Sequence, residues 1–263
     1  MSDIKLFHFG AFCPYGLHMI GEVDIAAKKL DYSFSVYDIG KEPRYAKEFE
    51  IFTPYMLLVN DELRYCKPMS HTQLIKKIKN KELDSWRRYT QRDPIREAFR
   101  IEDLRYNEIY RSVPICMEGT VDVYDAQKSN WALHHHKSTG IIHFGYIAWS
   151  KQSYFPVGAN QILPANLIPF PIPEHNKEIA FIICLHSKPK MGDYRRDLIR
   201  HAIKDLPSRG YTSCQVIAGK NTAYPNGPAY IFEEYDFEEK TILQKVELKD
   251  GYEPLILLEY QFT

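Results

Sequence analysis

The residues with the clearest chemical potential form a basic turn, His186 to Asp193, between an apolar run and a helical pattern. Asp193 is the predicted N-cap of that helix, and Arg195 and Arg196 fall in its first turn. The helix dipole penalises a cation there by about 0.3–1 kcal/mol, and a bound anion would reverse the penalty. The turn therefore predicts a site for a phosphate-bearing ligand; the alternative is two exposed arginine side chains without a ligand.

Cys13 is a second residue that could do chemistry. It lies in the segment Phe12-Cys13-Pro14-Tyr15-Gly16, after a strand-like run and before a helical pattern. A cysteine at a helix N-terminus can have a lowered pKa, because the helix dipole favours the thiolate. Cys13 is therefore a candidate nucleophile. The five cysteines are widely spread without a Cys-x-x-Cys pair, which indicates reduced thiols rather than disulfides or a zinc site.

The composition indicates a globular protein with a packed interior. Of 263 residues, 44% are hydrophobic, and 34 basic residues balance 34 acidic ones. This balance gives no overall attraction to nucleic acid or to an anionic membrane. The N-terminus lacks the pattern of a signal peptide, and no apolar run approaches the roughly 18 residues that span a bilayer. We expect a cytoplasmic protein.

The first part of the chain predicts a small α/β domain in the order βαβαββα. Its expected elements are strands over 4–9, 33–37, 55–59 and 63–67, and helices around 20–30, 43–52 and 74–78. This order, with Phe12 to Gly16 after the first strand and Thr53-Pro54 before the third, resembles the thioredoxin and glutaredoxin fold. The resemblance covers about residues 3–80.

The resemblance to thioredoxins implies a cis peptide bond before Pro54 and places this proline near Cys13. It also implies that Gly16 occupies the position of the resolving cysteine, so the usual intramolecular disulfide is not expected. Thiol chemistry at Cys13 and a partner-binding domain without chemistry both remain open.

The middle of the chain predicts a helix followed by an antiparallel sheet. The helix is expected over 95–110, and strands are expected over 119–124, 131–136 and 141–149. A proline-rich stretch, 156–173, is too long for a simple connection and predicts a functional loop. We place the domain boundary near Arg88, which gives domains of 1–87 and 88–263.

The last third of the chain carries the more specific pattern. The continuous apolar run 179–185 is typical of a central strand; a helix from Tyr194 to Leu206 and a strand over 211–218 follow it. Strand, glycine turn, helix and strand in this order resemble the cofactor-binding core of the Gcn-related N-acetyltransferases, the GNAT superfamily. The resemblance covers residues 96–263 and is strongest over 178–240. Strands over 241–248 and 255–262 complete the pattern.

The predicted fold class is thus α/β (α+β), with a thioredoxin-like βαβαββα domain followed by a GNAT-like mixed, mostly antiparallel sheet flanked by helices. The pairing is similar to bacterial YoaP-like fusions with the domain order reversed. The GNAT resemblance implies an N-acetyltransferase that moves an acyl group from acetyl-CoA or another acyl-CoA to an amine, by default on a small molecule. The implied cofactor-binding residues are Ile183, Cys184, Leu185, Lys190, Met191, Gly192, Asp193, Tyr194, Arg195 and Asn226.

Direct transfer needs a base for the amine and an acid for the departing thiolate. In the GNAT resemblance a backbone N–H of the strand 182–185 polarises the thioester carbonyl. Tyr230 or Tyr235 is the candidate acid, because the position of the family's tyrosine falls on Phe232. The candidate bases are Glu178, His186 and the run His134-His135-His136.

Three further possibilities stay open. The histidine run could bind a metal, but on a strand its side chains would alternate between faces, so no metal is expected. The chain could be a non-catalytic interaction or sensor protein with a degenerate GNAT fold, or its chemistry could be centred on Cys13. A protein partner could then bind through the thioredoxin-like domain.

Overall fold

The computed structural model describes residues 2–86, 98–117, 122–188 and 191–262. The chain divides into two compact units. The first consists of Met1–Trp86 with the short segments Pro169–Pro171 and Val246–Tyr252, and the second holds the remaining residues. Among the described residues, no helix is long and apolar enough to cross a membrane.

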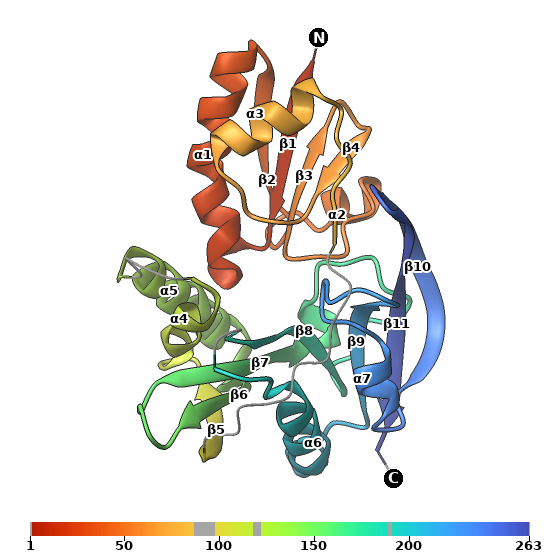
Figure 1. Cartoon of the computed structure of the whole chain (residues 1–263). Helices are drawn as coiled ribbons and strands as arrows, with labels where there is room; N and C mark the ends of the chain where they lie inside the picture. Colours follow the sequence, from red (N-terminus) through yellow and green to blue (C-terminus); the bar gives the residue numbers. More distant parts are fainter. Residues whose placement is uncertain (1, 87–97, 118–121, 189–190, 263) are drawn as a thin grey trace. The chain divides into compact units, whose positions relative to one another are not determined.

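A four-stranded sheet organises the first unit, with the strand order β2-β1-β3-β4 (Figure 1). Its strands are β1 (Asp3–His8), β2 (Ser33–Asp38), β3 (Tyr55–Val59) and β4 (Leu63–Tyr65). β1 pairs in parallel with β2 and antiparallel with β3, and β4 extends the sheet as an antiparallel hairpin. Every residue of β3 is buried, as its continuous apolar sequence predicts.

The helices of the first unit are α1 (Pro14–Leu30), α2 (Arg44–Glu48) and α3 (His71–Lys79). Pro14 suits the first turn of α1, and Met19, Val23 and Ala26 form the buried face that packs on the sheet. Ser70 and Gln73 form a capping box at the start of α3. The predicted order of elements, βαβαββα, is observed.

A seven-stranded mixed sheet organises the second unit, in the order β10-β11-β9-β8-β7-β6-β5. Its strands are β5 (Phe99–Arg105), β6 (His143–Ser150), β7 (Pro156–Pro164), β8 (Ile179–Ser187), β9 (Ser213–Gly219), β10 (Glu238–Leu248) and β11 (Gly251–Gln261). β8 and β9 pair in parallel, whereas the ladders from β5 to β8 and between β9 and β11 are antiparallel. This agrees with the predicted mixed, mostly antiparallel sheet and the central place of 179–185.

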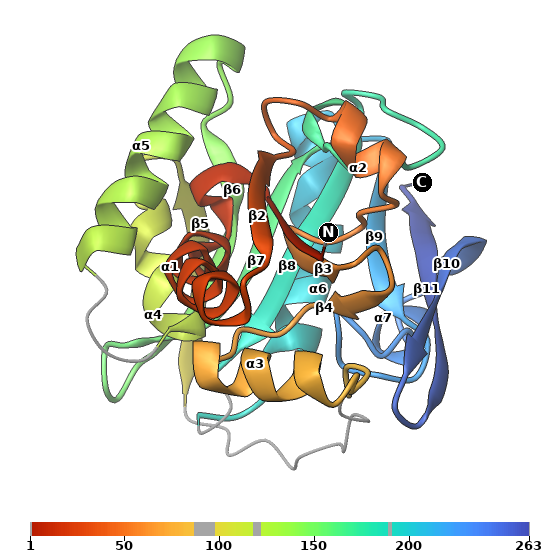
Figure 2. The same ribbon diagram turned by 90° about the horizontal axis from the view of Figure 1, so that it is seen from above.

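Helices lie on both faces of the second unit's sheet. α6 (Arg195–Asp205) packs against β6, β7 and β8, and its buried residues Leu198, Ile199 and Ala202 join the core. α4 (Val113–Cys116) and the longer α5 (Asp122–Thr139) lie on the side opposite α6 (Figures 1 and 2). A short helix, α7 (Tyr230–Glu233), follows β9.

Several element predictions for the middle of the chain were wrong. The expected helix 95–110 contains β5, in which Phe99 and Ile101 alternate until an irregularity between Asp103 and Arg105 shifts the register and buries Leu104. The expected strand 131–136 lies within α5, which contains no glycine or proline and begins with acidic residues that suit a helix N-terminus. Of the expected strand 119–124, residues 122–124 also belong to α5 and the rest lie outside the described residues.

The prediction of a loop over 156–173 was wrong for the first half of this segment. Residues 156–164 form β7, which lies between β6 and β8 and is buried throughout. Its prolines stand at the two ends of the strand, where the missing N–H costs little.

Candidate functional site

The central pair of parallel strands, β8 and β9, separates partway along its length. The ladder runs from the Ile179–Ser213 pair to the Ile182–Val216 pair and then stops, although β8 continues to Ser187. On its other edge, β8 carries an extra residue, Ile183, opposite β7. We call the segments Ile183–Leu185 and Ile217–Gly219 the β8–β9 divergence. Backbone groups in the middle of a sheet are left without a strand partner there.

The side chain of Asn226 supplies those missing partners. Its Oδ1 accepts a hydrogen bond from the Leu185 N–H at 2.9 Å, and its Nδ2 donates to the carbonyl oxygens of Ile183 at 3.2 Å and Ile217 at 3.0 Å. Asn226 is only 3% exposed. One carboxamide thus bonds to both strands of the divergence.

The loop that carries Asn226 is held by its own polar network. The buried carboxylate of Glu253 accepts hydrogen bonds from the backbone N–H groups of Asn221 and Thr222 at 2.7 and 2.9 Å. A Cβ at Gly227 would stand 2.3 Å from the carbonyl oxygen of Thr222 in the loop and 2.5 Å from that of Gly219 at the end of β9. In this structure the loop thus holds the Asn226 side chain against β8 and β9.

The predicted phosphate turn leads from β8 into α6, and its first amides are capped within the protein. Ser187 Oγ accepts from the Tyr194 N–H at 2.9 Å, and Asp193 Oδ1 accepts from the Arg195 N–H at 3.1 Å. Asp193 caps the turn as expected from its chemistry, but the N-cap residue of α6 is Tyr194, one position later than predicted. Gly192 adopts a φ of 106°, which favours glycine.

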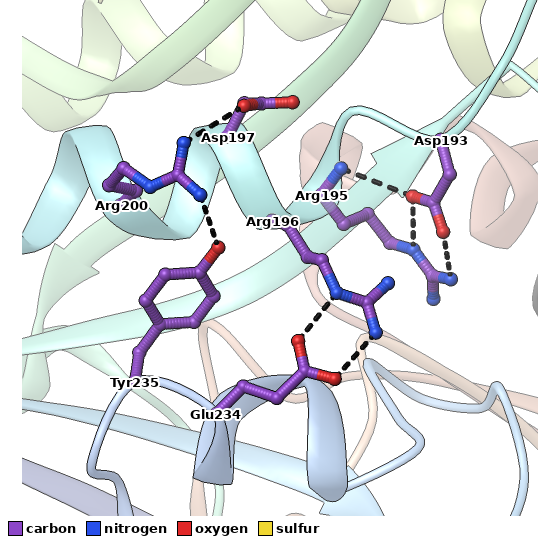
Figure 3. A network of polar contacts seen from close by, with 7 residues as sticks. All are labelled: Asp193, Arg195, Arg196, Asp197, Arg200, Glu234 and Tyr235. Carbon is purple, nitrogen blue, oxygen red and sulfur yellow. Dashed lines mark hydrogen bonds and ion pairs between the residues drawn. The ribbon is translucent and has the colours of Figure 1, made fainter. Parts of the chain in front are cut away.

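The two arginines at the start of α6 form ion pairs with carboxylates (Figure 3). Arg195 donates through Nε and Nη2 to Asp193. Its Nη1 donates to the Gly227 carbonyl oxygen. Arg196 binds Glu234 through Nε at 2.6 Å and Nη2 at 2.7 Å, and this bonding lowers the pKa of Glu234. Both guanidinium charges are thus balanced by acidic side chains.

The residues predicted to bind the cofactor form two groups in the structure. Ile183, Leu185 and Asn226 are joined by hydrogen bonds at the divergence, whereas Gly192, Asp193, Tyr194 and Arg195 form the turn before α6. Cys184 and Met191 are half-buried beside them along the chain, and Lys190 lies outside the described residues.

The candidate acids lie at α7 and face α6. Tyr230 is exposed, with the Arg196 guanidinium 5.9 Å from its ring centroid. The hydroxyl of Tyr235 accepts from Arg200 Nη2 at 3.2 Å (Figure 3). Phe232 is buried in the core.

The candidate bases separate into three places. Glu178 precedes β8 at the end away from the divergence, and about seven residues of strand correspond to roughly 23 Å. His186 lies in β8 just beyond Leu185 and is half-buried. The histidine run lies on α5, where His135 and His136 bond through Nδ1 to the carbonyl oxygens of Trp131 and Ile141. Of the candidates, His186 is the one in the strand segment that leaves the divergence.

A carboxylate and histidine group in the second unit has the spacing of metal ligands. Asp103, His143 and Asp205 offer atoms within 4.8 Å of one another. Arg209 forms ion pairs with both carboxylates, so a guanidinium already supplies the positive charge.

In the first unit, Cys13 stands at the N-cap of α1, as predicted, and its side chain is half-buried. The expected cis bond before Pro54 is not observed: among the described residues, the cis bonds precede Pro225 and Pro228. The turn at Pro54 is closed instead by Thr53 Oγ1, which donates to the Tyr55 carbonyl oxygen at 2.8 Å.

Gly16 is required by the close packing of α1 on β1. A Cβ at Gly16 would stand 2.9 Å from the Cβ of His8, which the strand holds in place. We expect Gly16→Ala to destabilise the protein by about 1–3 kcal/mol, because the helix must shift. Gly21→Ala is the matched change in the same helix, because nothing lies within 4 Å of a Cβ built at Gly21. Since alanine favours helix over glycine, Gly21→Ala should stabilise the protein by about 0.5–1 kcal/mol. Urea unfolding of both variants measures the difference, and equal effects would contradict the packing argument.

The sequence missed two residues that define the site, Glu234 and Glu253. The hydrogen-bond partner of each residue lies more than 30 positions away in the sequence. The one local signal was Glu253 beside Pro254 in an otherwise apolar run.

Comparison with solved structures gives distant similarities to acetyltransferases. An N-acetyltransferase from Staphylococcus aureus Mu50 aligns with a TM-score of 0.44 at 10% identity, over 64% of this chain and 100% of that chain. A putative acetyltransferase from Salmonella typhimurium with its cofactor acetyl-CoA gives 0.41 at 12%, over 64% and 95%. A spermidine N-acetyltransferase from Vibrio cholerae gives 0.42 at 10%, over 62% and 93%.

No family model matches the sequence, and no curated protein sequence is similar to it. The structural similarities are too distant to assign an activity, so the functional argument rests on the geometry of the divergence and the α6 turn.

Proposed function

We propose that the second unit is an N-acyltransferase that binds an acyl-coenzyme A, by preference acetyl-CoA, at the β8–β9 divergence and acylates an amine, by default on a small molecule. The observation that supports the proposal is the separation of two central parallel strands, β8 and β9, with α6 as the next helix after β8. Strand separation presents backbone donors and acceptors to a chain-like ligand, and the helix N-terminus favours its phosphates.

The residues of the divergence fit an extended chain that contains amides. The pantetheine arm of coenzyme A carries secondary amides, each with one N–H and one carbonyl group. The Asn226 carboxamide already bonds to Leu185 N–H and the Ile183 carbonyl in this way, so a ligand amide can replace it once Asn226 moves. Arg195 and Arg196 lie where the phosphates would meet α6, and each would exchange a carboxylate for a phosphate.

Bound acyl-CoA supplies the thioester, and the chain's own groups orient and assist the reaction. The Leu185 N–H, released from Asn226, would donate to the acyl carbonyl oxygen. His186, in the strand segment beyond Leu185, is our candidate for accepting the proton of the amine. Glu178 lies too far along β8 for that role.

Binding of acetyl-CoA tests the proposal, and Arg196 and Arg200 provide a matched pair of variants. Arg196 lies in the first turn of α6 and Arg200 one turn later, where it binds Asp197 and Tyr235. In isothermal titration we expect micromolar binding by the wild type and a loss of about tenfold in Arg196→Ala, equivalent to about 1.4 kcal/mol. Arg200→Ala should change affinity less than twofold. Equal losses in both variants would contradict a phosphate site at the first turn.

The second candidate is a non-catalytic role, in which the second unit has the fold but binds no acyl-CoA. Two observations favour it: Asn226 occupies the divergence, and the arginines of α6 are already paired. Wild-type protein that gives no binding heat with acetyl-CoA or with coenzyme A at millimolar concentration would support this candidate.

For the first unit we propose a thioredoxin-like domain that binds a protein partner. The parallel β1–β2 pair, the antiparallel β1–β3 pair and a cysteine at the N-cap of α1 support it. Gly16 stands at the position where a dithiol motif would carry its second cysteine, which favours partner binding over dithiol chemistry as the role of this unit.

A further inference from the structure

Two cysteines of the second unit, far apart in sequence, lie together at one face of the sheet. Cys116 ends α4 and Cys184 lies in β8, and the two thiols share a hydrogen bond. α4 packs against β7 and β8, and Lys188 Nζ at the end of β8 donates to the Pro114 carbonyl oxygen at 3.5 Å. The packing of a helix on a strand therefore brings the two sulfur atoms together.

Two basic side chains, His186 and Lys128, lie near this thiol pair. His186 lies two residues after Cys184 and so on the same face of β8. Lys128 of α5 is only 1% exposed. The hydrogen bond from Cys184, with the charges of His186 and Lys128, outweighs desolvation and lowers the pKa of Cys116 to about 5. The hydrogen bond from the Cys184 thiol favours the thiolate form of Cys116.

Cys116 and Cys184 are less buried than the third cysteine that the structure describes in this unit. Cys116 and Cys184 are both half-buried, whereas Cys214, on β9, is 1% exposed and burial raises its pKa. A charged thiolate, a neighbouring thiol and partial exposure together make a reactive pair, in contrast to a buried structural cysteine.

We propose that Cys116 and Cys184 form a thiol–disulfide exchange site for low-molecular-weight disulfides. The Cys116 thiolate attacks one sulfur of the disulfide, forms a mixed disulfide, and releases the first thiolate, which takes a proton from solvent. Cys184 loses its proton to solvent and attacks the Cys116 sulfur, which forms the Cys116–Cys184 bond and releases the second thiolate. The small disulfide is reduced to two thiols and the cysteine pair is oxidised by the same two electrons.

This exchange uses neither Asn226 nor the arginines of α6, but it shares His186 with the proposed acyl transfer. Its product would fix the end of α4 to β8 beside Ile183 and Leu185. The site differs from Cys13, which belongs to the first unit.

The test uses the reduced full chain, oxidised glutathione as the disulfide, and peptide mass spectrometry after acid quenching. We expect a Cys116–Cys184 linked peptide, with Cys214 unmodified. Cys184→Ser should instead accumulate glutathione on Cys116, because the resolving step is lost. Cys116→Ser should react at Cys184 at least tenfold more slowly.

The pH dependence of alkylation by iodoacetamide gives a second readout. The rate at Cys116 should have its midpoint near pH 5, because the thiolate is the nucleophile, and Lys128→Met should raise this midpoint. Lys151→Met, an exposed lysine in the same unit, should leave it unchanged. A midpoint near the value of a free cysteine, about 8.5, or mixed disulfides on both cysteines without a linked peptide, would overturn the proposal.

Discussion

Replacing Asn226 by alanine should destabilise the second unit by about 3–5 kcal/mol, because a buried backbone group left without its partner costs about 1–3 kcal/mol. The change removes the bonds to the Leu185 N–H and to the carbonyl oxygens of Ile183 and Ile217 together. Asn226 is buried, so water cannot readily replace all three. Urea unfolding of the full chain, followed by circular dichroism, measures the loss.

Asn221→Ala is the matched control for this prediction. Asn221 lies in the same loop, is exposed, and donates through Nδ2 to Glu253 at 3.2 Å. Its loss should cost less than about 1 kcal/mol, as for other exposed polar contacts. If the two variants unfold at the same urea concentration, Asn226 does not join the diverging strands in solution.

Replacing Gly145 by alanine should have the largest effect on folding, above about 4 kcal/mol. A Cβ at Gly145 would stand 1.9 Å from the carbonyl oxygen of Asn160, a backbone atom of the neighbouring strand β7. The φ of Gly145, 123°, is also one that alanine rarely adopts. We expect insoluble protein, or a second unit that limited proteolysis degrades at room temperature.

Gly140→Ala separates the two causes. Gly140 also has a positive φ, 78°, but nothing lies within 4 Å of a Cβ built there. Strain alone should cost about 1 kcal/mol, and the variant should stay soluble and resistant to proteolysis. A soluble, protease-resistant Gly145→Ala protein would show that β6 and β7 do not approach each other this closely.

The elements that were predicted well are those whose hydrophobic period is regular. β3 and β8 are continuous apolar runs, and α6 buries residues at helical spacing. β5 was missed because an irregularity after Asp103 moves the buried position from residue 103 to Leu104, which turns an alternating pattern into an apparently helical one.

The helix α5, which was predicted as strand, contains side-chain contacts between residues one helical turn apart. In α5, Ser138 and Thr139 donate to carbonyl oxygens one turn earlier, and the His135 ring packs on Trp131 four residues before it. The contact between the Trp131 and His135 rings, four residues apart, supports a helix in the segment that was predicted as a strand. Such contacts exist only once the helix has formed, so the sequence pattern did not indicate them.

The candidate site was predictable where its partners are local. Asp193 and Arg195 are two positions apart, and a turn that begins a helix brings them together. Other contacts depend on where α7 and the loop before it lie relative to the sheet: Arg196 pairs with Glu234, and Asn226 bonds to β8. Hydrophobic periodicity does not indicate the position of that loop.

The most direct test of acyl-CoA binding at the divergence is the amide signal of Leu185 in protein labelled with ¹⁵N-leucine, assigned by its disappearance in Leu185→Ile. We predict a saturable shift of this signal on titration with acetyl-CoA, because the N–H exchanges Asn226 Oδ1 for the ligand. A signal that stays unchanged at millimolar acetyl-CoA would contradict the proposed function and leave Asn226 as a permanent part of the fold.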